Sequence, residues 1–159
     1  MHVGVIFNDR SFRDALVNAL QSSGGHTTRA FATAAAALID ITEKPFDLIA
    51  LDAVTFPGFG AGDSHINDLA ALIPKTDYNE TLLYWEVTLR LIDCVRAEGC
   101  VNVETPIAVR VSNALPASIG MGDVLSKEAV RKDLGRRAQV HWLLSSSPEA
   151  FCEDVCRLD

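Results

Sequence analysis

The sequence predicts an α/β fold in which helices cover both faces of a doubly wound, five-stranded parallel sheet. Short apolar runs, typical of buried strands, alternate along the chain with segments of helical periodicity. Over the first 52 residues the alternation is strand, helix, strand, helix, strand. Two further apolar runs follow, so the strands are expected to end near Phe7, Phe31, Leu51, Val111 and Leu144. Right-handed crossovers leave few other topologies for such a repeat.

Each early element has a local signal. The first strand, 3–7, is followed by Ser11-Phe12-Arg13-Asp14, which resembles a capping box and predicts a helix start. Apolar residues then recur at helical spacing until Gly24-Gly25 ends the helix. A second strand, 27–31, and an Ala-rich helix, 33–42, lead to a Pro45 break and the third strand, 46–52.

The later elements follow from the same patterns. Trp85, Leu89, Ile92 and Val95 recur at helical spacing and predict a core-facing helix that Gly99 ends. The fourth strand, a helix over 126–134, the fifth strand and a last helix from 147 onward complete the order.

Asp52 is the residue that best indicates a functional site. It closes the third strand, and the carboxyl ends of central parallel strands open onto the crevice where α/β proteins bind ligands. Asn8 and Asp9 follow the first strand, so the three polar side chains are expected to meet at one edge of the sheet. On position alone, an Asp52 that simply begins an exposed turn stays an open alternative.

The order of elements and the position of Asp52 resemble the receiver domain of bacterial response regulators. Forty-four positions separate Asn8 from Asp52, about the family's spacing between its second metal-binding acid and its phosphoacceptor. Arg13, Ser112 at the end of a later strand, and the helix start at Ser147 extend the likeness. The resemblance implies a flavodoxin-like receiver fold and a role in two-component signal transduction.

In that family the Asp at the end of the third strand accepts a phosphoryl group from a histidine kinase, which makes Asp52 the phosphoacceptor candidate. The chemistry needs a carboxylate nucleophile, Mg²⁺ held by acids on the first strand, a hydroxyl on the fourth and a Lys on the fifth. By this match the pocket around Asp52 consists of Asn8, Asp9, Ser112 and Ser145.

Three of these supporting positions depart from the family pattern. Phe7 and Asn8 stand where the paired acids belong, with Asp9 one residue late, and Ser145 stands where the Lys belongs. Asn8, Asp9 and Asp52 are therefore weak Mg²⁺ candidates, and the expected cofactor is none or weakly bound Mg²⁺. Without the Lys and one of the metal-binding acids, the negative charge on a transferred phosphoryl group would lack two of the groups that neutralise it. The favoured hypothesis is a pseudo-receiver, not an enzyme, that signals through protein–protein interaction without efficient phosphorylation.

Two alternatives stay open. One is a conventional receiver phosphorylated on Asp52 by a histidine kinase, in which Asp9 supplies the missing acid and Lys127 or Arg110 replaces the Lys. The other is a small α/β enzyme or nucleotide-binding protein that uses the crevice at the strand ends. Against the second, the sequence has no Gly-x-Gly-x-x-Gly after the first strand, no Walker loop and no Gly-x-Ser-x-Gly elbow.

The chain is expected to form one domain, 1–159, with an insertion after the third strand. Asp52 and Ser112 are 60 positions apart, roughly twice the family's separation, which places the insertion at about 56–81. The insertion leaves the sheet at the edge that carries Asp52. It is therefore predicted to partly cover or remodel the pocket, hindering phosphotransfer while offering a new contact surface.

Composition excludes several classes of protein. With 48% hydrophobic and 22% charged residues the chain is not disordered, and its net charge of −7 argues against general nucleic-acid binding. No apolar run approaches a membrane span and nothing resembles a signal peptide, so a cytoplasmic protein without membrane contact is expected. Cys152 and Cys156 are i, i+4 neighbours on the predicted last helix, where two packed thiols are favoured over a metal pair.

A basic stretch interrupts this acidic background. Five basic and two acidic residues lie between positions 127 and 137. A solvated helix face is the default interpretation of such a run. In receivers the corresponding face binds partners, so the resemblance implies an interaction surface for a histidine kinase, another signalling protein or a second copy in a homodimer. Its residues are Lys127, Arg131, Lys132 and Trp142.

Overall fold

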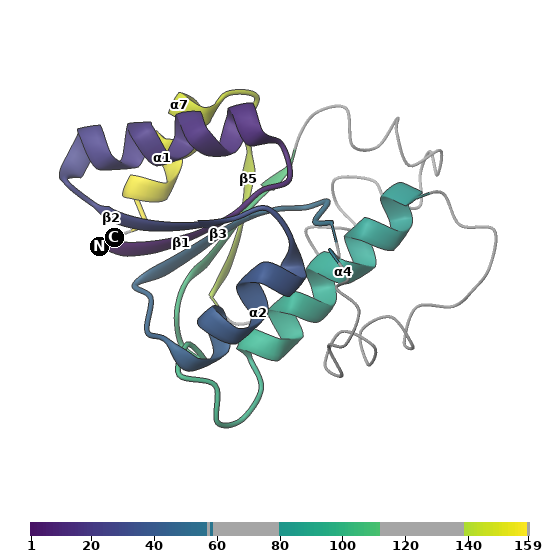
Figure 1. Ribbon diagram of the computed structural model, residues 1–159. Coiled ribbons are helices and arrows are strands. Elements are labelled where there is room, and N and C mark those ends of the chain that lie inside the picture. The colour runs from purple at the N-terminus through teal and green to yellow at the C-terminus, as the bar shows by residue number, and fades with distance from the viewer. Residues whose placement is uncertain (57, 59–79, 112–138, 159) are drawn as a thin grey trace.

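The sheet is parallel throughout, with the strand order β2-β1-β3-β4-β5 (Figure 1). The computed structural model describes residues 1–56, 58, 80–111 and 139–158, and of residues 80–84 and 86 the backbone only. Strand β2 lies on one side of β1, and the chain then crosses to the other side of β1 to form β3. The strand order therefore reverses between β1 and β3, and the carboxyl ends of these two strands border the crevice of a doubly wound sheet. The strands are β1 (His2–Ile6), β2 (Thr27–Phe31), β3 (Leu48–Asp52), β4 (Ile107–Val111) and β5 (Val140–Leu144).

Among the described residues, two helices cover each face of the sheet. Helices α1 (Arg10–Gly24) and α7 (Pro148–Cys156) lie on one face, and α2 (Ala34–Glu43) and α4 (Glu80–Val95) lie on the other (Figure 1). Successive residues of a strand point to opposite faces, and β3 shows it directly. Leu48 and Ala50 pack with the α1 and α7 layer, whereas Ile49 and Leu51 pack with the α2 and α4 layer.

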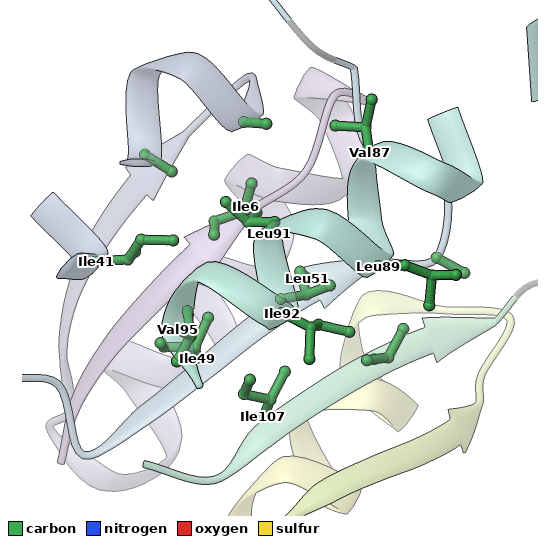
Figure 2. Close-up of a cluster of buried hydrophobic side chains, with 14 of the residues drawn as sticks. Ile6, Ile41, Ile49, Leu51, Val87, Leu89, Leu91, Ile92, Val95 and Ile107 are labelled. Atoms are coloured by element: carbon green, nitrogen blue, oxygen red, sulfur yellow. The ribbon is translucent and has the colours of Figure 1, made fainter. Parts of the chain in front are cut away.

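The layer between the sheet and α2 and α4 is a continuous apolar core, drawn in Figure 2. The side chains labelled there are buried and belong to β1, β3, β4, α2 and α4. They are Ile6, Ile41, Ile49, Leu51, Val87, Leu89, Leu91, Ile92, Val95 and Ile107. Because residues 48–51 of β3 are all buried, Asp52 is the first side chain of that strand to approach the surface.

The predicted five-stranded parallel sheet is confirmed, and each strand ends within one residue of its expected end. The stripe on α4 is buried, as expected from its helical spacing. The predicted helix start at Ser11 is wrong. Helix α1 begins at Arg10, and Asp9 is its N-cap, with Oδ1 accepting a hydrogen bond from the Phe12 N–H. Asp caps as well as Ser does, and Asp9 comes first after the strand.

Two predicted segments lie largely or wholly outside the residues that the structure describes. The insertion at about 56–81 lies outside the described residues for nearly all of its length, and the helix over 126–134 lies wholly outside them. In the ranges that the structure describes, no helix combines the length and the apolar character needed to cross a bilayer.

Candidate functional site

Asp52 ends β3 at the carboxyl edge of the sheet, where the sequence placed it. Its backbone is held from the α4 side of the sheet. The Asp52 carbonyl accepts hydrogen bonds from the hydroxyls of Thr55, at 3.0 Å, and Thr88 on α4, at 3.2 Å. Asp52 is thus fixed in position by its own loop and by a helix that lies thirty-six positions further along the chain.

The Asp52 carboxylate is paired with Arg110 of β4. Arg110 is the residue opposite Asp52 in the β3–β4 ladder, and its Nη1 lies 3.1 Å from Asp52 Oδ2. The two side chains are only 18% and 14% exposed. The other carboxylate oxygen, Oδ1, accepts a hydrogen bond of 3.2 Å from the Val54 N–H. Both oxygens of Asp52 therefore have partners within the protein.

Arg110 also joins the neighbouring elements. Its Nε donates to the carbonyl of Ser145, just after β5, over 3.3 Å. Its guanidinium carbon lies 3.8 Å from the centre of the Phe12 ring on α1, which is within cation–π range. One side chain thus connects the carboxyl ends of β3, β4 and β5 with the first turn of α1.

Burial and pairing with Arg110 shift the pKa of the Asp52 carboxyl in opposite directions. Removal from water raises the pKa of the Asp52 carboxyl above its ordinary value of 3.8, and this is the largest effect. The positive charge of Arg110 and the N–H groups of Val54 and Ala53 oppose it by stabilising the charged form. The outcome is a raised pKa, so the guanidinium offsets only part of the cost of burying this carboxylate.

Asn8 uses both ends of its amide to hold the loop after β3. Its Nδ2 donates to the carbonyl of Val54 and its Oδ1 accepts from the N–H of Phe56, each over 2.7 Å. Two short hydrogen bonds of this kind bridge β1 and the β3 loop across 46 and 48 positions of sequence. The side chain predicted to be a pocket residue is thus a structural clamp beside Asp52.

Asp9 and Phe7 both contribute to the packing of α1. The Oδ1 of Asp9 caps the helix, so the acid that is one residue late in the receiver pattern accepts from the Phe12 N–H at 3.1 Å. Phe7 is fully buried, stacks on Phe12 with ring centroids 5.1 Å apart, and meets Phe151 edge-on at 5.8 Å. Arg13, five residues after Asn8, donates to the Phe7 carbonyl over 2.8 Å.

Of the two serines predicted to line the pocket, the structure describes Ser145 but not Ser112. Ser145 is buried, and its hydroxyl donates to the Ser147 carbonyl at 3.0 Å while its own carbonyl receives Arg110. Ser112 lies outside the described residues. Of the residues described, Arg110 contacts Asp52 directly, Ser145 is linked to it through Arg110, and Asn8 holds the loop that follows it. Asp9 lies at the start of α1.

The predicted interaction surface is described at only one position. Lys127, Arg131 and Lys132 lie outside the described residues. Trp142 on β5 is half-buried, and its ring meets Trp85 of α4 edge-on with centroids 5.7 Å apart. Trp142 also packs against the core of which Trp85 is part. The docking role assigned to it stays a prediction.

Arg110 contributes more to the pocket than the sequence predicts. The sequence offers it only as a substitute for the missing Lys, yet its side chain contacts Asp52, Ser145 and Phe12. A signal was present, because Arg110 interrupts the apolar run Ile107-Ala108-Val109, and a charge in an inner parallel strand requires a partner. Thr88 had no such signal, since its partner is a backbone carbonyl distant in sequence.

No family model and no curated protein sequence matches the chain. Solved structures do match, over 99% of its length. The chemotaxis response regulator CheY4 of Vibrio cholerae is 19% identical, is covered over 98% of its length and superposes with a TM-score of 0.61. This chain has the receiver fold.

Other receiver structures give the same result. The response regulator receiver domain protein (CheY-like) from Methanospirillum hungatei is 16% identical with a TM-score of 0.57, and 93% of it is covered. The Francisella response regulator 1452 receiver domain is 16% identical with a TM-score of 0.58, and 94% of it is covered. Identities this low establish the receiver fold, whereas activity has to be argued from the site.

Proposed function

We propose that this protein is an atypical receiver that acts in signal transduction by binding another protein, without depending on phosphorylation of Asp52. One observation carries the proposal: the Asp52 carboxylate is paired with Arg110, a cation supplied by the neighbouring strand. The receiver fold supports a signalling role as opposed to a classical enzyme.

The chemistry of phosphoryl transfer explains why this pair matters. A carboxylate nucleophile must present a free oxygen lone pair, and metal ions and cations must neutralise the incoming phosphoryl oxygens. Here Oδ2 accepts from Arg110 and Oδ1 from the Val54 N–H, so both oxygens are engaged, and these hydrogen bonds lower the nucleophilicity of the lone pairs that remain. The ion pair with Arg110 gives Asp52 a counter-charge from within the protein.

The oxygens around Asp52 already have hydrogen-bond partners, which supports the proposal that the site binds Mg²⁺ weakly or not at all. A hard divalent ion requires several free oxygen ligands, preferably charged. Asn8 Oδ1 receives the Phe56 N–H, Asp9 Oδ1 receives the Phe12 N–H, and the Arg110 charge stands beside Asp52. Within the described residues no cluster of three or more His, Cys, Asp or Glu side chains is arranged to hold a metal ion.

A conventional receiver remains the second candidate, because Arg110 lies where it could neutralise a phosphoryl group in place of the missing Lys. Its Nη1 is 3.1 Å from the carboxylate that would carry the phosphoryl group. Under this candidate Arg110 assists transfer, whereas under the first it competes with the phosphodonor for Asp52.

Intact-mass analysis after treatment with acetyl phosphate and Mg²⁺ separates the two candidates. We expect no phosphoryl adduct on the wild type. An adduct that disappears in Asp52→Asn would contradict the proposal. If that adduct also disappears in Arg110→Ala, but persists in the matched surface variant Arg10→Ala, Arg110 assists phosphoryl transfer. Arg10 is a suitable control because its side chain is 85% exposed.

The partner is proposed to be a protein, either a histidine kinase or another cytoplasmic signalling protein. The net charge of −7 disfavours nucleic acid as the ligand. A homodimer is the simplest partner to examine, by light scattering over a concentration series. Because output is independent of phosphorylation under this proposal, Asp52→Asn should bind any partner as tightly as the wild type does, provided that it stays folded.

A further inference from the structure

A second group of reactive side chains lies at the opposite edge of the sheet from Asp52. Met1 and His26 directly precede β1 and β2, and Cys156 is the last residue of α7. The Cys156 sulfur lies 3.7 Å from Nε2 of His26, and Nδ1 of His26 lies 3.2 Å from the Met1 nitrogen. Ser23 of α1 completes the group, with its Oγ 3.6 Å from Cys152 Sγ and 4.0 Å from Cys156 Sγ.

The contact with Met1 sets the tautomer of His26. The Met1 nitrogen is a donor only, whether it is an ammonium group or a peptide N–H, so Nδ1 of His26 must accept. In the neutral ring the proton then resides on Nε2, which faces Cys156 Sγ. The sulfur of Cys156 therefore receives an N–H donor whose direction is fixed from the other side of the ring.

The backbone leaves room for this ring. A Cβ atom added at Gly24 would lie 2.5 Å from Nε2 and 2.7 Å from Cε1 of His26, closer than real side chains approach each other. Glycine at position 24 thus permits the His26 ring to reach Cys156 across the end of α1.

Cys156 is distinguished from the three other cysteines by its surroundings. Cys152 is only 4% exposed, and burial raises the pKa of its thiol. Burial likewise raises the pKa of Cys94. Cys100 is held by the backbone, since its sulfur donates to the Ile41 carbonyl at 3.6 Å and accepts from the Asn102 N–H at 3.4 Å. Cys156 is half-buried at the surface end of its helix and faces an imidazole.

We propose that Cys156 is a site of reversible oxidation by hydroperoxides, with His26 as a positioning residue. The Cys156 thiolate attacks one oxygen of hydrogen peroxide, and an S–O bond forms as the O–O bond breaks. The sulfur is oxidised by two electrons to sulfenic acid and the peroxide is reduced. The leaving hydroxide takes up the proton that the thiol released and departs as water. The His26 N–H orients the sulfur and stabilises its charge during attack.

Trapping of sulfenic acid with a cyclic 1,3-dione tests the proposal on the full chain. The protein is treated with hydrogen peroxide, and the adduct on each cysteine is followed over time by peptide mass spectrometry. We expect Cys156 to react about tenfold faster than Cys100 in the same molecule. His26→Leu should reduce the Cys156 rate to about that of Cys100, and His26→Gln, which keeps an N–H donor, should restore about half of it.

Gly24→Ala provides an independent perturbation that keeps every reactive group. The added methyl displaces only the end of the His26 ring, and Ala favours the helix, so the fold should be retained. This variant should slow oxidation of Cys156 and leave Cys100 unchanged. Equal rates at Cys156 and Cys100 in the wild type, or a Cys156 rate unaffected by both His26→Leu and Gly24→Ala, would overturn the proposal.

Discussion

Arg110→Met removes the guanidinium that pairs with Asp52 and keeps an apolar stem of similar length. The two side chains are 14% and 18% exposed, so the pair is largely out of water. Removing one partner of a buried ion pair costs about 3–5 kcal/mol, because the remaining charge has no compensation. Asp52 can limit this cost by taking up a proton. We therefore expect unfolding free energy to fall by about 3 kcal/mol at neutral pH, the lower end of that range.

The loss should increase with pH. Burial raises the pKa of Asp52 in the folded state above the ordinary 3.8, so the folded protein holds this proton more tightly than the unfolded chain does. The associated stability is present below the ordinary pKa and is lost as pH rises through the folded-state value. Without Arg110 the opposing charge is gone. Arg110→Met should consequently lose more stability at about pH 7 than at about pH 5.

Urea unfolding followed by tryptophan fluorescence measures these changes, since Trp85 is buried in the core and the half-buried Trp142 packs against it. The double variant Arg110→Met/Asp52→Asn should recover more than half of the loss, because no unpaired charge is left buried. Arg10→Met, at an exposed position, should change stability by less than about 0.5 kcal/mol. The reasoning is refuted if Arg110→Met is as stable as the Arg10 control, or if the double variant is no better than Arg110→Met alone.

Four further predictions concern the surroundings of the site and the base of the sheet. Mg²⁺ should leave the Tm of the wild type unchanged, because the oxygens near Asp52 are engaged; a rise that Asp52→Asn abolishes would contradict this. Asp9→Ala should cost about 1 kcal/mol through loss of the N-cap, and Asp9→Ser should restore it; no loss in urea unfolding would argue against the cap. Asn8→Ala should cost about 1–3 kcal/mol and speed hydrogen exchange at the Phe56 amide, whereas unchanged exchange would show that the clamp is unimportant. Asn102→Ala should cost about 2–4 kcal/mol, because its 1% exposed amide bonds two carbonyls, a backbone N–H and a threonine hydroxyl; a cost below about 1 kcal/mol would be inconsistent with that network.

The sheet was predictable because its signals are local. Inner parallel strands are buried on both faces and read as apolar runs, as 48–51 does, and their spacing fixes the order of elements. The N-cap of α1 was misplaced by two residues because Asp9 and Ser11 are both good N-caps. Which of them caps the helix depends on where the chain leaves β1, a tertiary feature that the helix sequence does not contain. Phe7 follows β1 and stacks on Phe12 of the first helical turn.

The site was predictable only in part, because its roles depend on register between distant segments. Asp52 was found because a strand end can be read from the sequence alone. The pairing with Arg110 depends on the β3–β4 register, which joins positions 58 residues apart across a long intervening segment. Asn8 has the right residue type for a metal pocket, and its use as a clamp depends on where the Val54 carbonyl and the Phe56 N–H fall.

Phe7 makes the gain of metal-dependent chemistry at this site a path of several steps. Its ring is enclosed by Phe12 and Phe151, so Phe7→Asp would place a carboxylate inside an aromatic cluster, at a cost of several kcal/mol, before any gain from Mg²⁺. A descendant of this chain would also have to release Asp52 from Arg110. Each intermediate would be less stable than its parent and no better at catalysis. Selection for stability alone would then disfavour the stepwise acquisition of a metal site at this position.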